Sequence, residues 1–188
     1  MKLIWVWLCI LAGVASAWAD DSTCAELNGA YEHAVNTGRY QTVSTVTGKG
    51  QDSGKLWLRT FYYDQTIYVR RPYFPWLSYR RGTLDHTDDG RSVFQNCTKL
   101  GTETMAGNDT TVFQTDWQRY GDKAVTKLWF STETGKLAQT ERFFTALDEN
   151  SFYSGLLGQS VLDRYAYDRG LPPPLEAYKA YLPTVHPE

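Results

Sequence analysis

The chain has 188 residues and a formal net charge of −2 at neutral pH. Proteins that bind nucleic acid usually present a strongly basic face, so this charge argues against DNA or RNA as the partner. Aromatic residues are abundant, with seven Trp, thirteen Tyr and eight Phe. A core of this size does not need so many rings, and we expect some of them to line a cavity or an interface.

The first 19 residues have the pattern of a secretory signal peptide. Lys2 precedes an apolar segment at 3–14, and Ala17-Trp18-Ala19 is a small-x-small cleavage motif. The apolar segment is shorter than a membrane span requires, so we do not expect an integral membrane protein. The pattern predicts cleavage after Ala19, export to the periplasm and a single mature domain over 20–188. The alternative is a short membrane anchor.

The cysteines predict one disulfide. Cys9 would leave with the signal peptide, so the mature chain would keep only Cys24 and Cys97. An exported chain with one available pair favours a disulfide between them, and two separate buried thiols are the alternative. These two distant cysteines and three scattered histidines show no ligand spacing, so we expect no metal and no other cofactor.

A helix is expected directly after the predicted cleavage site. Asp21 and Ser22 are favourable N-cap residues, and Gly38 would end the helix. Between them the small and apolar residues recur at helical spacing, which predicts one buried face. These residues are Cys24, Leu27, Tyr31, Ala34 and Val35. A disulfide from Cys24 would attach this helix to the strand that contains Cys97.

Strands are predicted over most of the remaining chain, at 40–47, 55–63, 66–71, 77–81, 92–100 and 161–167. The segment 101–144 adds further strands, separated by turn residues at Gly107-Asn108-Asp109, Gly121-Asp122 and Thr134-Gly135. This segment predicts a wide antiparallel sheet as the centre of the protein. In the first strand the polar residues alternate with β-branched ones, which favours one face in contact with water.

The C-terminal part contains a stiff spacer at Pro172-Pro173-Pro174. Pro174 is suited to open a short helix that places Leu175, Tyr178 and Leu182 on one face.

The sequence contains no nucleophile elbow, no His-Glu-x-x-His pair and no phosphate-binding glycine loop. The densest polar cluster is Asp85-His86-x-Asp88-Asp89, which a solvated turn explains without any function. We therefore expect a protein that is not an enzyme.

Two groups of residues are candidates for binding. The first consists of rings that would line a cavity, and the second of arginines that flank the proline-aromatic loop at 72–75 and would meet an anionic partner. Ordinary charge on an edge strand is the alternative for the arginines. The cavity candidates are Trp57, Phe61, Trp76, Phe113, Trp129 and Phe143, and the arginines are Arg70, Arg71, Arg80 and Arg81.

The order of elements resembles the LolA/LolB-like periplasmic lipoprotein-carrier superfamily over roughly residues 24–167. The motifs that carry the resemblance are Arg71-Pro72, Phe74, Trp76, Asp89-Gly90, and Leu128-Trp129-Phe130 followed by Gly135-Lys136-Leu137. The resemblance implies an α+β fold, in which a curved antiparallel sheet forms an incomplete β-barrel around an apolar cavity. It also implies an N-terminal helix and short helices packed on the concave side. The implied ligand is an acyl chain or another hydrophobic molecule.

Two functional hypotheses follow. The first is a soluble, non-catalytic periplasmic protein that holds a lipid, a lipid-modified protein or another hydrophobic moiety in its half-barrel. The second is a protein-binding module, such as a periplasmic immunity protein or an envelope-assembly factor, with the aromatic residues as interface anchors.

Overall fold

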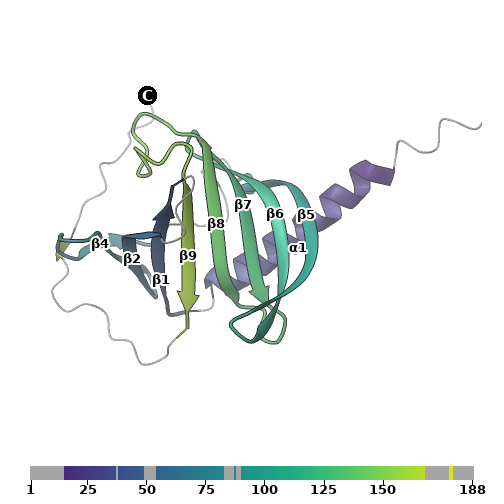
Figure 1. Cartoon of the computed structure of the whole chain (residues 1–188), viewed down its shortest axis with the longest axis horizontal. Coiled ribbons are helices and arrows are strands. Elements are labelled where there is room, and N and C mark those ends of the chain that lie inside the picture. Colours follow the sequence, from purple (N-terminus) through teal and green to yellow (C-terminus); the bar gives the residue numbers. More distant parts are fainter. Residues whose placement is uncertain are drawn as a thin grey trace, which may run out of the picture.

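The computed structural model describes residues 15–36, 38–48, 54–82, 87, 90–167 and 178–179. They contain one helix and ten strands (Figure 1). The strands form a single sheet in the order β10-β4-β3-β2-β1-β9-β8-β7-β6-β5. The elements are α1 (Ala15–Asn36), β1 (Tyr40–Thr47), β2 (Lys55–Tyr63), β3 (Thr66–Arg70), β4 (Leu77–Arg80), β5 (Phe94–Met105), β6 (Asn108–Arg119), β7 (Asp122–Ser131), β8 (Leu137–Ala146), β9 (Ser160–Ala166) and β10 (Tyr178–Lys179).

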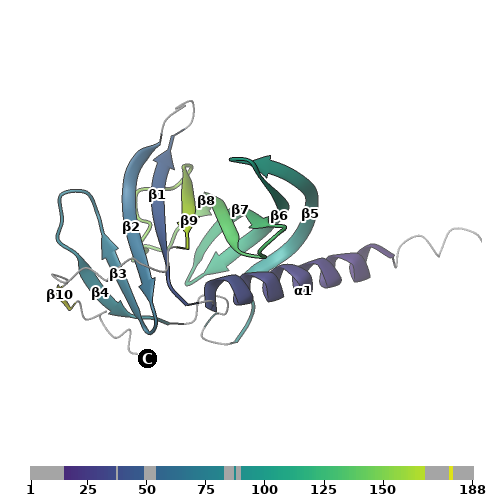
Figure 2. The ribbon, with the colours of Figure 1, turned by 90° about the horizontal axis from the view of Figure 1, so that it is seen from below.

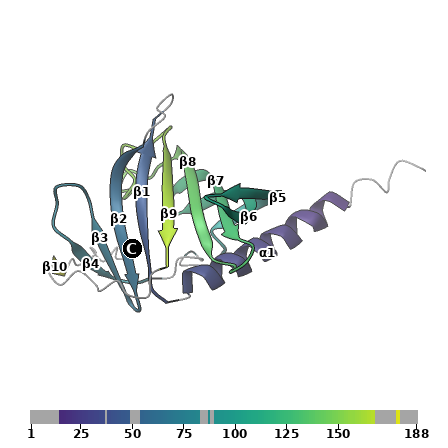
Figure 3. The same cartoon turned by 60° about the horizontal axis from the view of Figure 1, so that its bottom comes forward.

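The sheet is strongly curved and does not close into a barrel. Neighbouring strands are antiparallel except for β10, which runs parallel to β4. Figure 2 shows β5 to β9 arching over α1, while β2 to β4 continue the same sheet beyond β1 as a second arm that leads away from the helix. Figure 3 shows the same arrangement, with β10 at the outer edge. The predicted α+β fold with an incomplete β-barrel is confirmed.

Helix α1 lies on the concave face of the sheet and is fixed there at several points. Leu27, Tyr31 and Ala34 are buried against that face. The predicted disulfide between Cys24 and Cys97 is confirmed and joins α1 to β5, with the two Cα atoms 5.0 Å apart. Among the described residues, no helix has the length and apolarity needed to cross a membrane. Residue Ala15, where α1 begins, lies before the predicted cleavage site.

The hairpin turns confirm the division of 101–144 into strands. The β5–β6 turn is formed by Ala106 and Gly107, and the β6–β7 turn by Tyr120 and Gly121. In both turns the two central residues have positive φ angles, at 49° and 82° in the first and 49° and 85° in the second. Positive φ at both positions is the backbone conformation that tight hairpins require, and glycine adopts it without strain.

Two expectations about the interior and the C-terminal part were wrong. Tyr178 and Lys179 do not belong to a helix, because they pair as a short strand with Leu77 and Ser78 of β4. The rest of the expected helix lies outside the described residues, as do His86 and its acidic neighbours. The short helices on the concave side that the resemblance implied are not found among the described residues, where α1 is the one helix and the loop 147–159 packs Tyr153 against Phe144.

Candidate ligand-binding site

A small enclosed pocket lies on the concave face between α1, the sheet and the loop 147–159. Its volume is about 100 Å³. The strands β1, β2 and β9 supply one wall, because cross-strand pairing places Tyr40 beside Tyr62 and Thr42 beside Thr60. The lining residues are Tyr31, Tyr40, Thr42, Ser44, Trp57, Leu58, Thr60, Tyr62, Trp117, Arg119, Arg142, Tyr153, Asp163 and Tyr165.

The hydroxyl-bearing side of β1 faces this pocket, whereas the sequence predicted only that one face of the strand would be in contact with water. Thr42 and Ser44 are buried, whereas Gln41 and Val43 on the other face are half-buried. The predicted period of two is present, and the structure shows that Thr42 and Ser44 are on the inner face. The reason is that the interior of this half-barrel is itself polar around β1, so hydroxyl groups can be accommodated there.

A buried ion pair forms the floor of the pocket. The guanidinium Nη1 of Arg142 in β8 lies 2.5 Å from Oδ2 of Asp163 in β9. The hydroxyl of Thr140 donates a hydrogen bond of 3.1 Å to the same carboxylate oxygen. Burial lowers the pKa of Arg142, but the Asp163 carboxylate more than offsets this, so the pKa of Arg142 lies above its usual value. The guanidinium of Arg142 therefore stays protonated inside the protein.

Tyrosine rings make up most of the remaining wall. Tyr40 and Tyr62 stack with ring centroids 4.3 Å apart, and Tyr153 lies 5.4 Å from Trp57. Burial raises the pKa of Tyr40, Tyr62, Tyr153 and Tyr165, because a phenolate loses its hydration in this environment. The hydroxyls are thus neutral groups that donate and accept hydrogen bonds.

A larger groove opens at the end of the half-barrel, where the β5–β6 and β7–β8 turns meet the end of β9. Its volume is about 670 Å³, and its walls are more apolar than polar. Tyr165 lines both this groove and the small pocket, so the two spaces adjoin at that ring. The groove is lined by Met105, Ala106, Asn108, Thr110, Ser131, Glu133, Thr134, Lys136, Leu137, Ala138, Gln139, Arg164, Tyr165 and Tyr167.

The predicted cavity residues do not gather at one place. Trp57 lines the small pocket, and Phe113 is buried in the core beside Phe130. Trp129 points to the face opposite Leu128, where its indole N–H donates to Glu103 at 2.9 Å. Phe143 is 44% exposed on that same convex face.

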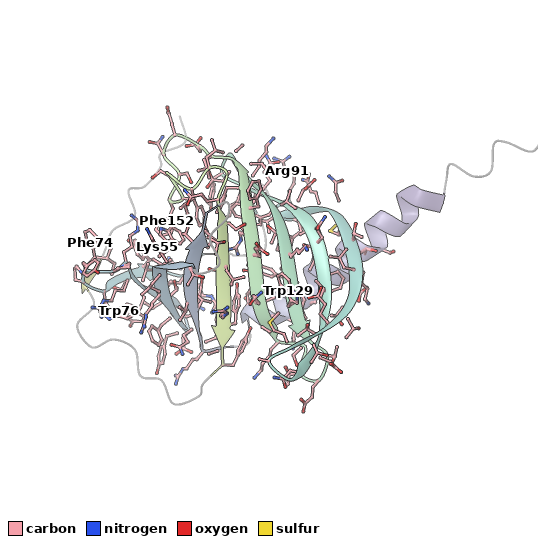
Figure 4. The ribbon with its side chains drawn as sticks, viewed as in Figure 1. Lys55, Phe74, Trp76, Arg91, Trp129 and Phe152 are labelled. Carbon is pink, nitrogen blue, oxygen red and sulfur yellow. A yellow bond between two sulfur atoms is a disulfide. The ribbon has the colours of Figure 1, made fainter. Side chains whose placement is uncertain are left out.

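The other two cavity candidates, Phe61 and Trp76, pack against each other with ring centroids 5.2 Å apart. They are on the second arm, away from the pocket, because Phe61 alternates with the pocket-facing Thr60 and Tyr62 along β2. Figure 4 shows Trp76 and Phe74 at the outer end of that arm.

The structure separates the predicted arginines into two pairs. Arg80 is opposite Thr66 in the β3–β4 ladder, whereas Arg70 is at the other end of β3. Arg71 contacts the loop 147–159, since it donates to the carbonyl oxygen of Phe152 at 3.2 Å. Arg81 instead donates to the carbonyl oxygen of Val35, at the end of α1. The four side chains therefore do not form a single cationic rim.

Sequence reasoning missed the polar residues of the pocket, chiefly Arg142, Asp163 and the tyrosines. One signal was available: hydroxyl-bearing residues recur at every second position in Tyr40-x-Thr42-x-Ser44 and in Thr60-x-Tyr62. Such a pattern also fits a solvated face, and only the pairing of β1 with β2 and β9 shows that it faces inward. Among the described residues, no three His, Cys, Asp or Glu side chains are grouped as a metal would require.

No protein-family model and no curated protein match the sequence. Solved structures with a similar fold include the lipoprotein LppX of Mycobacterium tuberculosis, with 13% identity, a TM-score of 0.45, and coverage of 78% of this chain and 94% of that one. A LolA superfamily protein from Nitrosomonas europaea has 11% identity, a TM-score of 0.23, and coverage of 81% and 94%. MucB, solved in complex with MucA(peri), has 12% identity, a TM-score of 0.36, and coverage of 79% and 56%.

The LolA-like group that the sequence resembles is thus among the solved structures found. At these identities the likeness concerns the fold, and it says nothing about what this chain binds.

Proposed function

We propose that the protein is an exported, non-catalytic binding protein that holds the apolar part of a ligand in the groove at the end of its half-barrel. The observation that carries the proposal is the groove itself, with a volume of about 670 Å³. This lies within the range of roughly 300–1,000 Å³ that is usual for small-molecule sites. Met105 and the rings of Tyr165 and Tyr167 offer apolar surface, and burial of an acyl chain there would contribute about 25 cal/mol per Å².

Filling the groove tests this function. Ala138 lines the groove, and Ala166 is exposed outside it, so Ala138→Trp and Ala166→Trp form a matched pair. We expect an environment-sensitive fluorescent fatty acid to bind the wild type and Ala166→Trp saturably, and to bind Ala138→Trp at least about tenfold more weakly, because the indole occupies the ligand's space. Equal binding to Ala138→Trp, or no binding to the wild type, would show that the groove is not the site.

A second candidate function, binding of a protein partner, is favoured by an exposed aromatic patch on the second arm. Tyr73 is fully exposed, and Phe74 and Phe152 are exposed at 62% and 46%. Arg71 connects these loops, because it directly precedes the loop 72–75 and its guanidinium lies 5.0 Å from the ring of Phe152. Clustered exposed rings with a cation are typical anchors of an interface.

The patch can be tested separately from the groove. If the patch binds an envelope protein, that protein should be retained on a resin that carries the immobilised wild type and lost on one that carries Phe74→Ser/Phe152→Ser. The control variant is Val125→Ser, at an exposed apolar position on the convex face, and its resin should still retain the protein. Retention that is equal on all three resins would exclude the patch as the contact.

The signal peptide stays a separate prediction, checked by N-terminal sequencing of the exported chain, which should begin at Asp20.

A further inference from the structure

The pocket beneath α1 contains hydroxyl groups that the protein itself leaves unused. Thr42, Ser44 and Thr60 are only 5%, 2% and 3% exposed and line the pocket. None of these three hydroxyls forms a hydrogen bond with another group in the described part of the chain. Buried polar groups are nearly always satisfied, by protein, by water or by a ligand. The hydroxyls therefore require partners that occupy the pocket.

The charges at the floor of the pocket balance each other. Asp163 neutralises Arg142 at 2.5 Å, so neither is available as a free ion for a charged ligand. The Nε of Arg142 is buried and has no hydrogen-bond partner among the described residues, which leaves one further donor in this region. Arg119, the second cation on the wall, has its guanidinium 4.9 Å from the ring of the exposed Tyr120. The floor of the pocket, where Arg142 and Asp163 neutralise each other and further donors and acceptors surround them, suits a neutral group that both donates and accepts hydrogen bonds.

Size and wall chemistry narrow the ligand further. The volume of about 100 Å³ corresponds to about three water molecules, or a three-carbon polyol of the size of glycerol. The rings of Tyr40 and Tyr62 are stacked, and Trp57 and Trp117 both contact Tyr153. Such rings cover the C–H groups of a polyol, while the hydroxyls of the strands meet its O–H groups.

From these features we propose that the pocket binds the neutral, hydroxyl-bearing head group of an amphiphile whose chain occupies the groove. Tyr165 lines both spaces, so a head in the pocket and a chain in the groove would adjoin at that ring. The ligand class is a neutral amphiphile of the monoacylglycerol type. This inference rests on the proposed function, because the chain of the ligand is placed in the groove.

The experiment compares two ligands that share the same acyl chain and differ in the head group. Purified protein is titrated with 1-decanoylglycerol and with decanoic acid at neutral pH, by calorimetry and by the fluorescence of Trp57 and Trp117. The variants Tyr62→Phe and Tyr63→Phe each remove one hydroxyl from neighbouring positions of β2, and only Tyr62 lines the pocket. Thr60→Val, which keeps the side-chain shape, provides a second pocket variant.

We expect the wild type to bind 1-decanoylglycerol at least about tenfold more tightly than decanoic acid. Tyr62→Phe and Thr60→Val should each weaken binding of 1-decanoylglycerol by about tenfold, the usual effect of one lost buried hydrogen bond. Neither should change the affinity for decanoic acid, and Tyr63→Phe should change neither affinity.

Three results would overturn the inference. If decanoic acid binds as tightly as 1-decanoylglycerol, or if Tyr62→Phe and Thr60→Val bind the glycerol ester like wild type, the head group is not in the pocket, and the groove remains the chain's site. If neither compound binds the wild type, the proposed function fails together with the inference. Circular dichroism confirms that each variant is folded, so weaker binding is not read as loss of structure.

Discussion

Arg81 shows how one side chain can serve the fold although its sequence position indicated a binding role. Its guanidinium donates to the carbonyl oxygen of Val35, one of the last carbonyls of α1, and lies 5.5 Å from the ring of Tyr62. A cation at this end of a helix is favourable, because it satisfies a free carbonyl and opposes the helix dipole.

Arg81→Met should therefore destabilise the protein by about 1–2 kcal/mol, since it removes a charged hydrogen bond from a partly buried helix end. Arg80 is the matched control, because it is exposed and should tolerate the same change within about 0.5 kcal/mol. Urea unfolding, followed by circular dichroism, measures both. Equal stability of the two variants would contradict the role assigned to Arg81.

The pocket tyrosines predict a loss of stability in alkali. Burial raises the pKa of Tyr40, Tyr62, Tyr153 and Tyr165 in the folded protein above the usual value near 10, so the folded state retains protons that the unfolded chain releases. Their contribution is fully present below about pH 10 and is lost as the pH rises towards the folded pKa values. Each such tyrosine lowers the free energy of unfolding by about 1.4 kcal/mol per pH unit in that window.

Unfolding free energies measured between pH 8 and 12, together with tyrosinate absorbance, test this expectation. The absorbance of the buried tyrosines should rise in the same step as the loss of near-ultraviolet circular dichroism. Tyrosinate absorbance that rises fully while the protein stays folded would contradict the shifts.

For single residues, the sequence predicted that aromatic side chains would line the concave face, but it did not predict which of them lie there. Trp57 and Phe113 do lie on the concave face, but Trp129 and Phe143 lie on the other. An alternating strand assigns its residues to two faces without saying which face is inside. Which face is inside depends on the partner strands. Near Trp57 the alternation is also interrupted, because a β-bulge between Ser44 and Thr45 shifts the register of β1 against β2.

At the scale of elements, α1 is the lid of the pocket and depends on its covalent attachment. The Cys24–Cys97 disulfide closes a loop with a sequence separation of 73 residues, and an ion pair of 2.7 Å between Lys99 and Glu26 supports it nearby. The ion pair is half-exposed and contributes little, so the disulfide is the main link.

The variant Cys24→Ser/Cys97→Ser should lose about 4 kcal/mol of stability, because the unfolded chain is no longer constrained by a loop of this length. Glu26→Gln, which breaks the ion pair alone, should cost less than about 1 kcal/mol. Chemical unfolding of both variants, and of the wild type with and without a reductant, gives these values. A wild type whose unfolding midpoint is unchanged by complete reduction would show that the disulfide does not stabilise the lid.

The strands and hairpin turns were predictable because their signals are local. Period-two alternation and Gly-containing turns defined β1, β2 and the strands of 101–144 closely. β10 was not predictable, since Tyr178 and Lys179 are extended only through pairing with β4, a contact far away in sequence. The helical spacing of Leu175, Tyr178 and Leu182 competed with that distant pairing, and the pairing determines the structure at Tyr178.

At the scale of the whole molecule, an unclosed sheet creates two adjoining spaces of different chemistry. The curvature of β5 to β9 around α1 leaves a small polar pocket beneath the helix and a larger, more apolar groove at the end of the half-barrel. The resemblance to LolA/LolB-like proteins led to an expectation of an apolar interior. The enclosed part is instead lined by hydroxyls and an ion pair, which the resemblance did not predict.

The central claim, that the half-barrel carries an apolar ligand, is tested most directly by native mass spectrometry of the protein purified without detergent from its source cells. The account predicts a species heavier than the bare chain, whose added mass is released into organic solvent, and which Ala138→Trp lacks while Ala166→Trp retains it. A wild type that shows only the mass of the bare chain, and that gains none on incubation with 1-decanoylglycerol, would contradict it.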